Sequence, residues 1–362
     1  MSKKILVINM GSTSSKLAYF EDDKKVAEQS YEHAAAELIK LETVEERCAY
    51  RRPLIESFIK ENNIDMTAVD AIAARGVGGG GSYKSGAYLI TEEVRDECAA
   101  GNGHQGLLTS TVIGYELSQK YNIPAYLYDV VPVNEIEPIA EITGSPLFKR
   151  TGGGHTLNTR ATARLVAKEL GKPYDECTFV VCHMGGGIST NLQKNGRIID
   201  IIGSSEGTFS PDRAGGVPEG PLRKLYKSGK YTEKEIGRML NGQGGLIAYL
   251  GTNDCKEVER RIGEGDAQAE LVYHAMAYQI AKGIGTLSVC VGGKLDAIIL
   301  TGGIANSKML TGWIKEYVGF IAPVIIKGGA IEIEALAGGV LRVLNGEEKV
   351  NSYEEVKASR GK

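Results

Sequence analysis

Two Met-Gly steps, Met10-Gly11 and Met184-Gly185, each follow an apolar run in this sequence. The first leads into the hydroxyl-rich turn Gly11-Ser12-Thr13-Ser14-Ser15, and the second into Gly185-Gly186-Gly187. A tight turn between strands leaves backbone N–H groups unpaired, and these groups together with hydroxyl donors can cradle phosphate oxygens. The first turn alone fits a polar hairpin equally well. The two turns together predict that a nucleotide's phosphate chain is held from both sides of a cleft.

Residues around the second turn extend this prediction. His183 precedes the turn by two residues and can donate a charge-assisted hydrogen bond to a phosphate. The glycines 185–187 carry no side chains, so backbone can approach an anion directly. Further along, an apolar run leads into Gly302-Gly303 and a helix start, where Asn306 or Ser307 could act as the cap. Backbone at that point could face a nucleoside or a phosphate.

Composition excludes several functional classes. A chain of 362 residues is too long for one ordinary core, so we expect two domains. A net charge of −3 gives no reason to expect a nucleic-acid or membrane partner. The only early apolar run, 5–8, is too short for a signal peptide, and no stretch approaches a membrane span, so we expect a cytoplasmic protein. The six cysteines show no metal-ligand spacing, and we expect them to be reduced.

Two other nucleotide-binding motifs fit poorly. The sequence contains no GxxxxGK[ST], so it is not a P-loop protein. The stretch GVGGGG at 76–81 resembles part of a dinucleotide fingerprint. However, the residues that follow it, SYKSG, read as a loop rather than as the helix that such a fingerprint requires.

The elements that must position these turns occur in a repeated order. Each half of the chain begins with a β-meander and ends with alternating strands and helices, which predicts an α/β fold made of two duplicated domains with mixed sheets. Expected strands cover 5–9, 16–20, 71–74, 125–128, 178–182, 189–192, 197–202, 297–300 and 324–326. Expected helices cover 43–61 (interrupted or kinked at Pro53), 104–121, 156–170, 266–287, 307–318 and 334–344.

Eight segments spread in order along nearly the whole chain carry a family likeness. They are INMGSTSSK, ARG before a glycine-rich loop, YDVVPV, HTLN, CHMGGGIS, FSPDRAGG, TGGIANSK and IEALAGGVLRVL. This set resembles the acetate and butyrate kinases, which belong to the actin-like ATPase superfold with ribonuclease H-like domains. The resemblance implies an acyl-substrate domain, 1–150 plus about 336–362, and a nucleotide domain, 151–335, with a cleft between them.

The resemblance also implies an activity: reversible phosphoryl transfer between a short-chain acyl phosphate and ADP, giving a carboxylate and ATP. A carboxylate nucleophile is already ionised at pH 7, so it needs no catalytic base. The task is to bring two anions together along an in-line path. We therefore expect arginines, a metal ion and neutral donors rather than a catalytic triad.

Four residues match the family's catalytic positions. Arg75 ends a strand, and its planar fork suits a carboxylate or the moving phosphoryl group, although a surface ion pair is its ordinary role. Arg213 resembles a second active-site arginine, in a loop whose length varies in the family. His155 opens a helix, where it can donate to a phosphoryl oxygen or simply act as a helix-start residue. Asp129 ends a strand and could orient Arg75 or a metal-bound water, or cap the following loop.

The resemblance implies further ligand contacts. Asn9 and Glu334 match the family's metal-side residues, and Mg²⁺ prefers such oxygen ligands. Glu334 would also favour a helix dipole with no metal present. A homo-oligomer is implied as well. Contacts to ATP or ADP are implied for Ser12, Thr13, Ser14, Lys16, His183, Gly185, Gly186, Gly187, Gly302, Gly303 and Asn306.

Two glycine runs depart from the family pattern beside expected site residues. Glycines 78–81 follow Arg75, and glycines 152–154 precede His155, where the family usually carries bulkier side chains. We hypothesise a wider acyl pocket that accepts longer or branched acids, with the alternative that looser loops make the enzyme slow. A preference for acetate or propionate, a non-catalytic nucleotide sensor and a sugar kinase with Asp129 as base also stay open.

Overall fold

The structure is a computed structural model that describes residues 2–11, 14–38, 40–77, 80–101 and 105–360. The chain divides into two compact units: a first unit of residues 1–134 with 331–362, and a second unit of residues 135–330. The expected boundaries were 150 and about 336. Residues 135–150 group with the second unit because they bond to its sheet: Glu137 N donates to Ile199 O at 2.9 Å, and Arg150 pairs with Asp200 at 3.0 Å.

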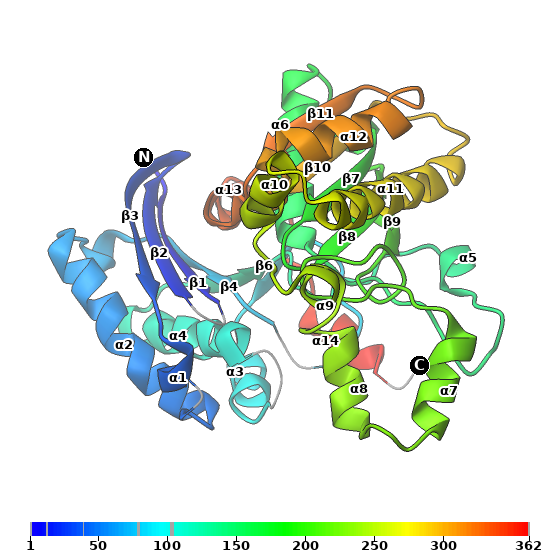
Figure 1. Cartoon of the computed structure of the whole chain (residues 1–362). Coiled ribbons are helices and arrows are strands. Elements are labelled where there is room, and N and C mark those ends of the chain that lie inside the picture. The colour runs from blue at the N-terminus through cyan, green and yellow to red at the C-terminus, as the bar shows by residue number, and fades with distance from the viewer. Residues whose placement is uncertain (1, 12–13, 39, 78–79, 102–104, 361–362) are drawn as a thin grey trace. The chain divides into compact units, whose positions relative to one another are not determined.

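A six-stranded mixed sheet forms the centre of the first unit (Figure 1). The order is β3-β2-β1-β4-β6-β5. The first three strands form an antiparallel meander, β4 and β6 run parallel to β1, and β5 is an antiparallel edge. The strands are β1 (Lys4–Met10), β2 (Ser14–Glu21), β3 (Lys24–Glu32), β4 (Ala71–Arg75), β5 (Ala87–Leu89) and β6 (Ala125–Tyr128).

Helices cover both faces of this sheet. Leu6 and Ile8 belong to the apolar core shared with α2 (Val44–Glu61) and α4 (Gln105–Tyr121). The opposite face, which carries the alternate residues of β1, is covered by α13 (Glu332–Leu344). Gly339 allows this close approach, since a Cβ there would lie 2.6 Å from the Tyr128 ring. The remaining helices of the unit are α1 (Ala35–Leu38), α3 (Glu92–Ala99) and α14 (Tyr353–Ala358).

The second unit repeats this plan with one strand fewer. Its sheet has the order β11-β10-β7-β8-β9, again an antiparallel meander joined to two parallel strands. The prediction of a duplicated α/β fold with mixed sheets is therefore confirmed. The strands are β7 (Thr178–Met184), β8 (Ile188–Lys194), β9 (Arg197–Ile202), β10 (Ala297–Gly302) and β11 (Val324–Gly328).

Helices also cover both faces of the second sheet. α6 (Thr156–Glu169) contacts β7 and β10 on one face, and α11 (Ala267–Val289) with α12 (Lys308–Val318) packs on the other. Strand β10 is buried along its whole length because both of its faces are covered. The remaining helices are α5 (Pro138–Glu141), α7 (Glu219–Lys227), α8 (Glu233–Leu240), α9 (Gly245–Leu250) and α10 (Cys255–Gly263).

One local expectation was wrong. Helix α2 runs through Pro53 without interruption, and Pro53 lies on its exposed side. The missing N–H removes one intrahelical bond. The core-facing side chains and a capping box at Thr43 keep the helix together. Strand β5 and helices α7 to α10 were not predicted, because their short segments lack a clear hydrophobic period.

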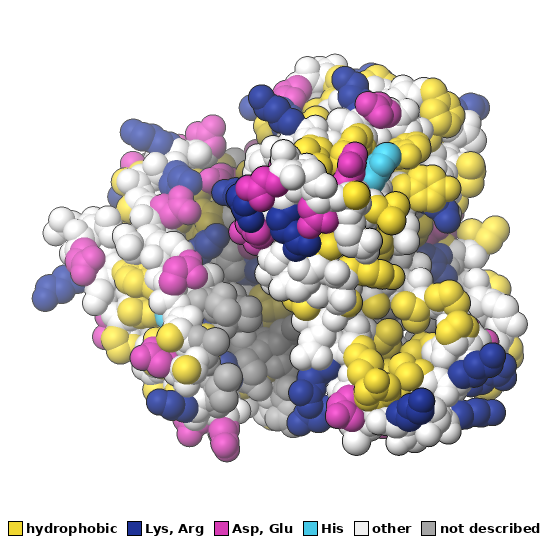
Figure 2. Space-filling view, in the orientation of Figure 1, with side chains coloured by type: hydrophobic (Ala, Val, Ile, Leu, Met, Phe, Trp, Pro, Cys, Tyr) yellow, Lys and Arg dark blue, Asp and Glu magenta, His cyan; other side chains and the backbone are white. Residues whose placement is uncertain are grey.

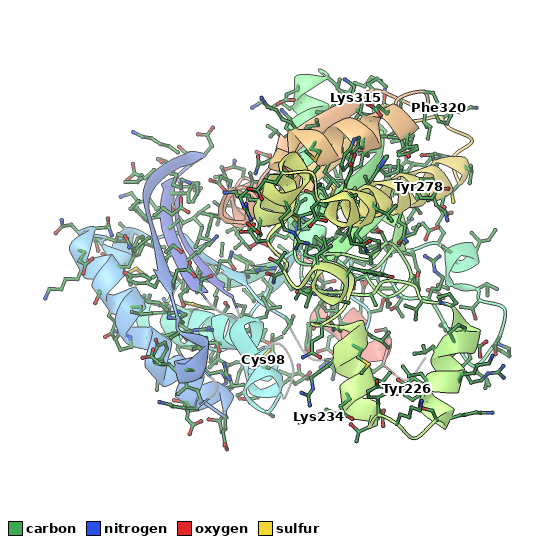
Figure 3. The ribbon with its side chains drawn as sticks, viewed as in Figure 1. Cys98, Tyr226, Lys234, Tyr278, Lys315 and Phe320 are labelled. Carbon is green, nitrogen blue, oxygen red and sulfur yellow. The ribbon has the colours of Figure 1, made fainter. Side chains whose placement is uncertain are left out.

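Exposed apolar side chains gather on the α11–α12 side of the second unit (Figure 2). Tyr278 is 49% and Phe320 86% exposed, and both are labelled in Figure 3. The expected homo-oligomer stays a prediction, since exposure alone names no partner. Across the described residues, no helix has the length and apolar character needed to cross a membrane.

Candidate active site

The first Met-Gly turn closes the hairpin between β1 and β2. The two strands pair as far as Met10 and Ser15, and Gly11 N donates to Ser14 O at 2.8 Å. Of the predicted phosphate contacts here, Ser12 and Thr13 lie outside the described residues. Ser14 is partly exposed at the start of β2, and Lys16 is an exposed residue paired with Asn9 across the hairpin.

Three polar side chains meet at the carboxyl ends of β1 and β4. Asn9 and Arg75 are paired neighbours in the parallel register of these strands. Glu332, in the first turn of α13, accepts from Asn9 Nδ2 at 3.0 Å through Oε2 and pairs with Arg75 Nη2 at 3.1 Å through Oε1. The buried Oδ1 of Asn9 finds no hydrogen-bond partner among the described residues. An unpaired amide oxygen beside a carboxylate is a donor set that suits Mg²⁺.

The carboxylate beside Asn9 is therefore that of Glu332, and the expectation for Glu334 needs correction. Glu334 lies two residues further along α13, and its side chain is 47% exposed. It pairs with Lys25 of β3 at 2.8 Å. Residues two apart on a helix point in directions about 200° apart, so only one of the two can face the end of β1.

Asp129 ends β6 with its backbone in the left-handed region, at φ +44°. Its Oδ1 accepts from Gly86 N at 2.7 Å, while its own N–H donates to Gly86 O at 3.0 Å. These bonds hold the loop before β5 against the end of β6. Asp129 thus has the loop-holding role that was the alternative to orienting Arg75. A direct role in the reaction stays a prediction.

The second Met-Gly turn repeats the first with shorter geometry. Strands β7 and β8 pair as far as Met184 and Ile188, and Gly185 N donates to Gly187 O at 3.0 Å. Gly187 lies directly against Arg213, because a Cβ there would be 2.6 Å from Nη1 of the arginine. The glycine run therefore serves close approach of a side chain as well as open backbone.

Arg213 is held in a loop fastened to the start of α9. Its Nη1 donates to Ser204 Oγ at 2.9 Å, and its Nε lies 3.6 Å from Asp212 Oδ1. Gly244 N donates to Asp212 O at 3.2 Å. Gly245 has φ +61°, and a Cβ there would lie 2.8 Å from Arg213 O, so only glycine fits. The guanidinium stays partly exposed, with 34% of its side chain accessible.

Two imidazoles stack beside this turn. His155, just before α6, and His183, in β7, have ring centroids 3.9 Å apart and planes 10° apart. Ser189 Oγ lies 2.9 Å from His155 Nδ1, and Asn158 Nδ2 lies 2.9 Å from His183 Nδ1. Asn158 also donates to Thr301 Oγ1 at 3.2 Å, which links the pair to β10. Each Nδ1 thus has a partner, and the ring orientations are defined.

The third predicted element forms a second glycine corner at the end of β10. Gly302 has φ +90° and exchanges two 2.9 Å backbone bonds with Gly329. Gly303–Asn306 is a short 3₁₀ helix, and Asn306 Nδ2 donates to Gly303 O at 3.1 Å. Of the two proposed caps for α12, Ser307 is the one used: its Oγ accepts from Leu310 N at 2.9 Å.

Comparison with known proteins identifies the family. The chain is 40% identical to butyrate kinase 2 of Clostridium acetobutylicum over 359 residues, which are 98% of this chain and 100% of that protein. Butyrate kinase 1 of the same organism is 40% identical over 356 residues, 97% of this chain and 99% of that protein. A family model described as the acetokinase family matches residues 143–320. The chain belongs to the acetokinase family.

Solved structures agree on the fold. Porphyromonas gingivalis acetate kinase superimposes with a TM-score of 0.78 at 20% identity, over 94% of this chain and 100% of that chain. This acetokinase-family chain therefore has the actin-like ATPase fold.

Within this acetokinase-family chain, sequence reasoning missed Glu332, Asn158 and Ser189. Glu332 carried a usable signal, since it opens the same helix as Glu334 and either could have been chosen. Asn158 was visible in the HTLN segment, one helical turn after His155. Ser189 had no local signal, because its role depends on the distance between β8 and the start of α6.

Proposed function

We propose that this chain is a short-chain carboxylate kinase, which transfers a phosphoryl group reversibly between an acyl phosphate and ADP. Butanoyl phosphate, or a longer or branched relative, is the proposed acyl phosphate. The 40% identity to two butyrate kinases over nearly the full chain supports this reaction class. The observation that carries the proposal within the structure is the carboxylate of Glu332, which joins Asn9 to Arg75.

Asn9 and Glu332 are the residues that we propose to hold Mg²⁺. One amide oxygen and one carboxylate suffice, because Mg²⁺ usually keeps several waters and takes other ligands from substrate phosphates. A bound Mg²⁺ supplies charge neutralisation on the nucleotide phosphates. The remaining Glu332 oxygen keeps the Arg75 guanidinium oriented beside that site.

The two arginines and the histidine pair divide the remaining work. We propose that Arg75 and Arg213 stabilise charge on the phosphoryl group in transfer, as fixed guanidinium donors do. His155 donates to a phosphoryl oxygen, and His183 with the Gly185–Gly187 backbone binds nucleotide phosphate. The Gly302-Gly303 corner, with Asn306, contacts the nucleoside side of ATP or ADP.

The glycine runs bear on the choice of acid only in part. A Cβ at Gly154 would lie 2.7 Å from Ile201 Cδ1, and one at Gly81 would lie 2.6 Å from Val356 O. Both glycines therefore have a packing reason. Gly80 has open space around its missing Cβ. A wider acyl pocket stays a hypothesis, and each additional buried CH₂ would favour binding by only about 0.8 kcal/mol.

A hydroxamate assay with ATP, Mg²⁺ and a series of C2 to C6 acids tests the proposal. We expect acyl phosphate from butyrate and its longer or branched relatives, with kcat/KM about tenfold lower for acetate. The variant Arg75→Ala should lose about 10²–10³-fold in kcat. Arg95→Ala is a matched control, since Arg95 forms surface ion pairs on α3.

Two results would contradict the proposal. A sharp preference for acetate would remove the wide-pocket hypothesis and leave the carboxylate kinase reaction. No acyl phosphate from any acid, with ATP still bound, would favour the non-catalytic nucleotide sensor.

A further inference from the structure

Helix α2 carries a buried arginine in the middle of its apolar face. The core-facing residues of the helix are Val44, Cys48, Arg51, Ile55 and Phe58, at the alternating spacing of four and three that marks one face. Arg51 is completely buried. An ionised side chain in such a position is costly unless it is paired, so a leucine or methionine would serve packing better.

The Arg51 guanidinium is only partly satisfied. Its Nη2 donates to Gly11 O at 2.8 Å, while Nε and Nη1 are buried with no hydrogen-bond partner among the described residues. The largest charge acting on it is that of Arg47, which has the same sign, and burial together with Arg47 lowers the pKa of Arg51. A positive charge thus lies uncompensated directly beneath the first Met-Gly turn.

The other neighbours of Gly11 also suit an anion. The first turn of the 17-residue helix α4 presses on Gly11, because a Cβ at Gly106 would lie 2.7 Å from the Gly11 carbonyl carbon. A helix start adds positive potential at that place. Ser15 Oγ lies 2.8 Å from Nε2 of the buried His33, and burial followed by the charge of Arg51 lowers the pKa of that imidazole.

We propose that Arg51 is a positioning residue for a phosphoryl anion bound beside Gly11. Its Nη2 holds the Gly11 carbonyl oxygen, which would repel a phosphate, on the buried side of the turn. Its unpaired charge supplies the fixed counter-charge that the anion neutralises on binding. The inference rests on the proposed function, in which this turn binds phosphate.

The test measures binding of inorganic phosphate and of Mg-ADP to the full chain, by calorimetry and by the ligand-induced rise in Tm. Arg51→Met keeps length and removes charge. It should fold, because replacing an unpaired buried charge by an apolar side chain is neutral or stabilising. Its Kd for phosphate should rise at least about tenfold, and the rise in Tm with phosphate should disappear.

Arg47→Met is the matched control. Arg47 lies one turn earlier on α2 and also donates to a backbone carbonyl, that of Leu38, at 2.9 Å. Its Kd for phosphate should stay within about twofold of the wild-type value. Arg51→Lys keeps the charge without the planar fork and should bind phosphate with intermediate affinity.

Wild-type phosphate affinity in Arg51→Met, or an equal loss in Arg47→Met, would overturn the inference. If Arg51→Met does not fold, Arg51→Lys decides, and an unchanged Kd in that variant overturns it. Failure of the proposed function would look different. The wild-type chain would then bind phosphate in an Arg51-dependent way and still produce no acyl hydroxamate from any acid.

Discussion

The imidazole rings of His155 and His183 stack at 3.9 Å, and each is tethered through its Nδ1 by a different side chain. The tethers leave both Nε2 atoms as the groups that can face a substrate. Because ring orientation is set by Ser189 and Asn158, the pair is preorganised in the way that transition-state stabilisation requires. Four predictions follow from this and the neighbouring contacts.

His155→Ala should lower kcat by about 10²–10³-fold, the usual cost of losing one preorganised donor to a developing charge. Ser189→Ala should have a smaller effect on kcat, because it removes only the tether of the ring. Steady-state kinetics of both variants provide the measurement. His274→Ala is the control, since His274 stacks on Trp313 in the second unit, with ring centroids 4.6 Å apart. Equal rates in all three variants would contradict a role for the histidine pair.

Glu332→Gln should raise the Mg²⁺ concentration needed for half-maximal activity by about tenfold, since it removes the charge beside Asn9. Glu334→Gln should leave that concentration unchanged and lower the free energy of unfolding by at most about 1 kcal/mol, because its ion pair with Lys25 is largely solvated. A magnesium titration of the two variants distinguishes the two carboxylates. A larger effect in Glu334→Gln would restore the original assignment.

Gly187→Ala should impair activity with little loss of stability. The new Cβ would come 2.6 Å from Arg213 Nη1 and 2.7 Å from its Cζ, so the partly exposed guanidinium must move. We expect kcat to fall by about tenfold or more while Tm changes by only a few degrees. Gly285→Ala in α11 is the control, because its Cβ would meet nothing and alanine favours a helix by about 0.5–1 kcal/mol. Wild-type kcat in Gly187→Ala would show that the Arg213 position does not matter.

The protein should lose stability as pH falls below neutrality, and His33 should account for part of the loss. Burial, followed by the charge of Arg51, lowers the pKa of His33 in the folded state. The unfolded chain takes up this proton below about pH 6.5, whereas the folded chain takes it up only at lower pH. The free energy of unfolding therefore falls as pH decreases from about 6.5 to the lowered pKa of the folded state.

Thermal unfolding at pH 7.5 and 5.5 tests this sign. The decrease in Tm between the two values should be smaller in His33→Gln than in the wild type. A decrease of the same size in both would assign the acid sensitivity to other groups.

Much of the fold could be predicted from the sequence, because its signals are local. Apolar runs bounded by Met-Gly turns defined the two hairpins, and the repeated order of elements indicated a duplicated α/β fold. The division at 134 rather than 150 could not be predicted, since it depends on hydrogen bonds that residues such as Glu137 form with a strand some 60 residues away.

The sequence by itself determined which residue types are available: the glycine corners, the two arginines, the two histidines and the hydroxyl-rich turn. Only the tertiary structure decided which of them meet. Asn9 and Glu332 are 323 positions apart, and their contact exists because α13 returns to the face of β1 opposite the one that α2 covers. Likewise, nothing in the period of α2 separates Arg51 from its apolar neighbours. Periodicity and turn chemistry act over a few residues, whereas the environment of a side chain is set by packing between distant segments.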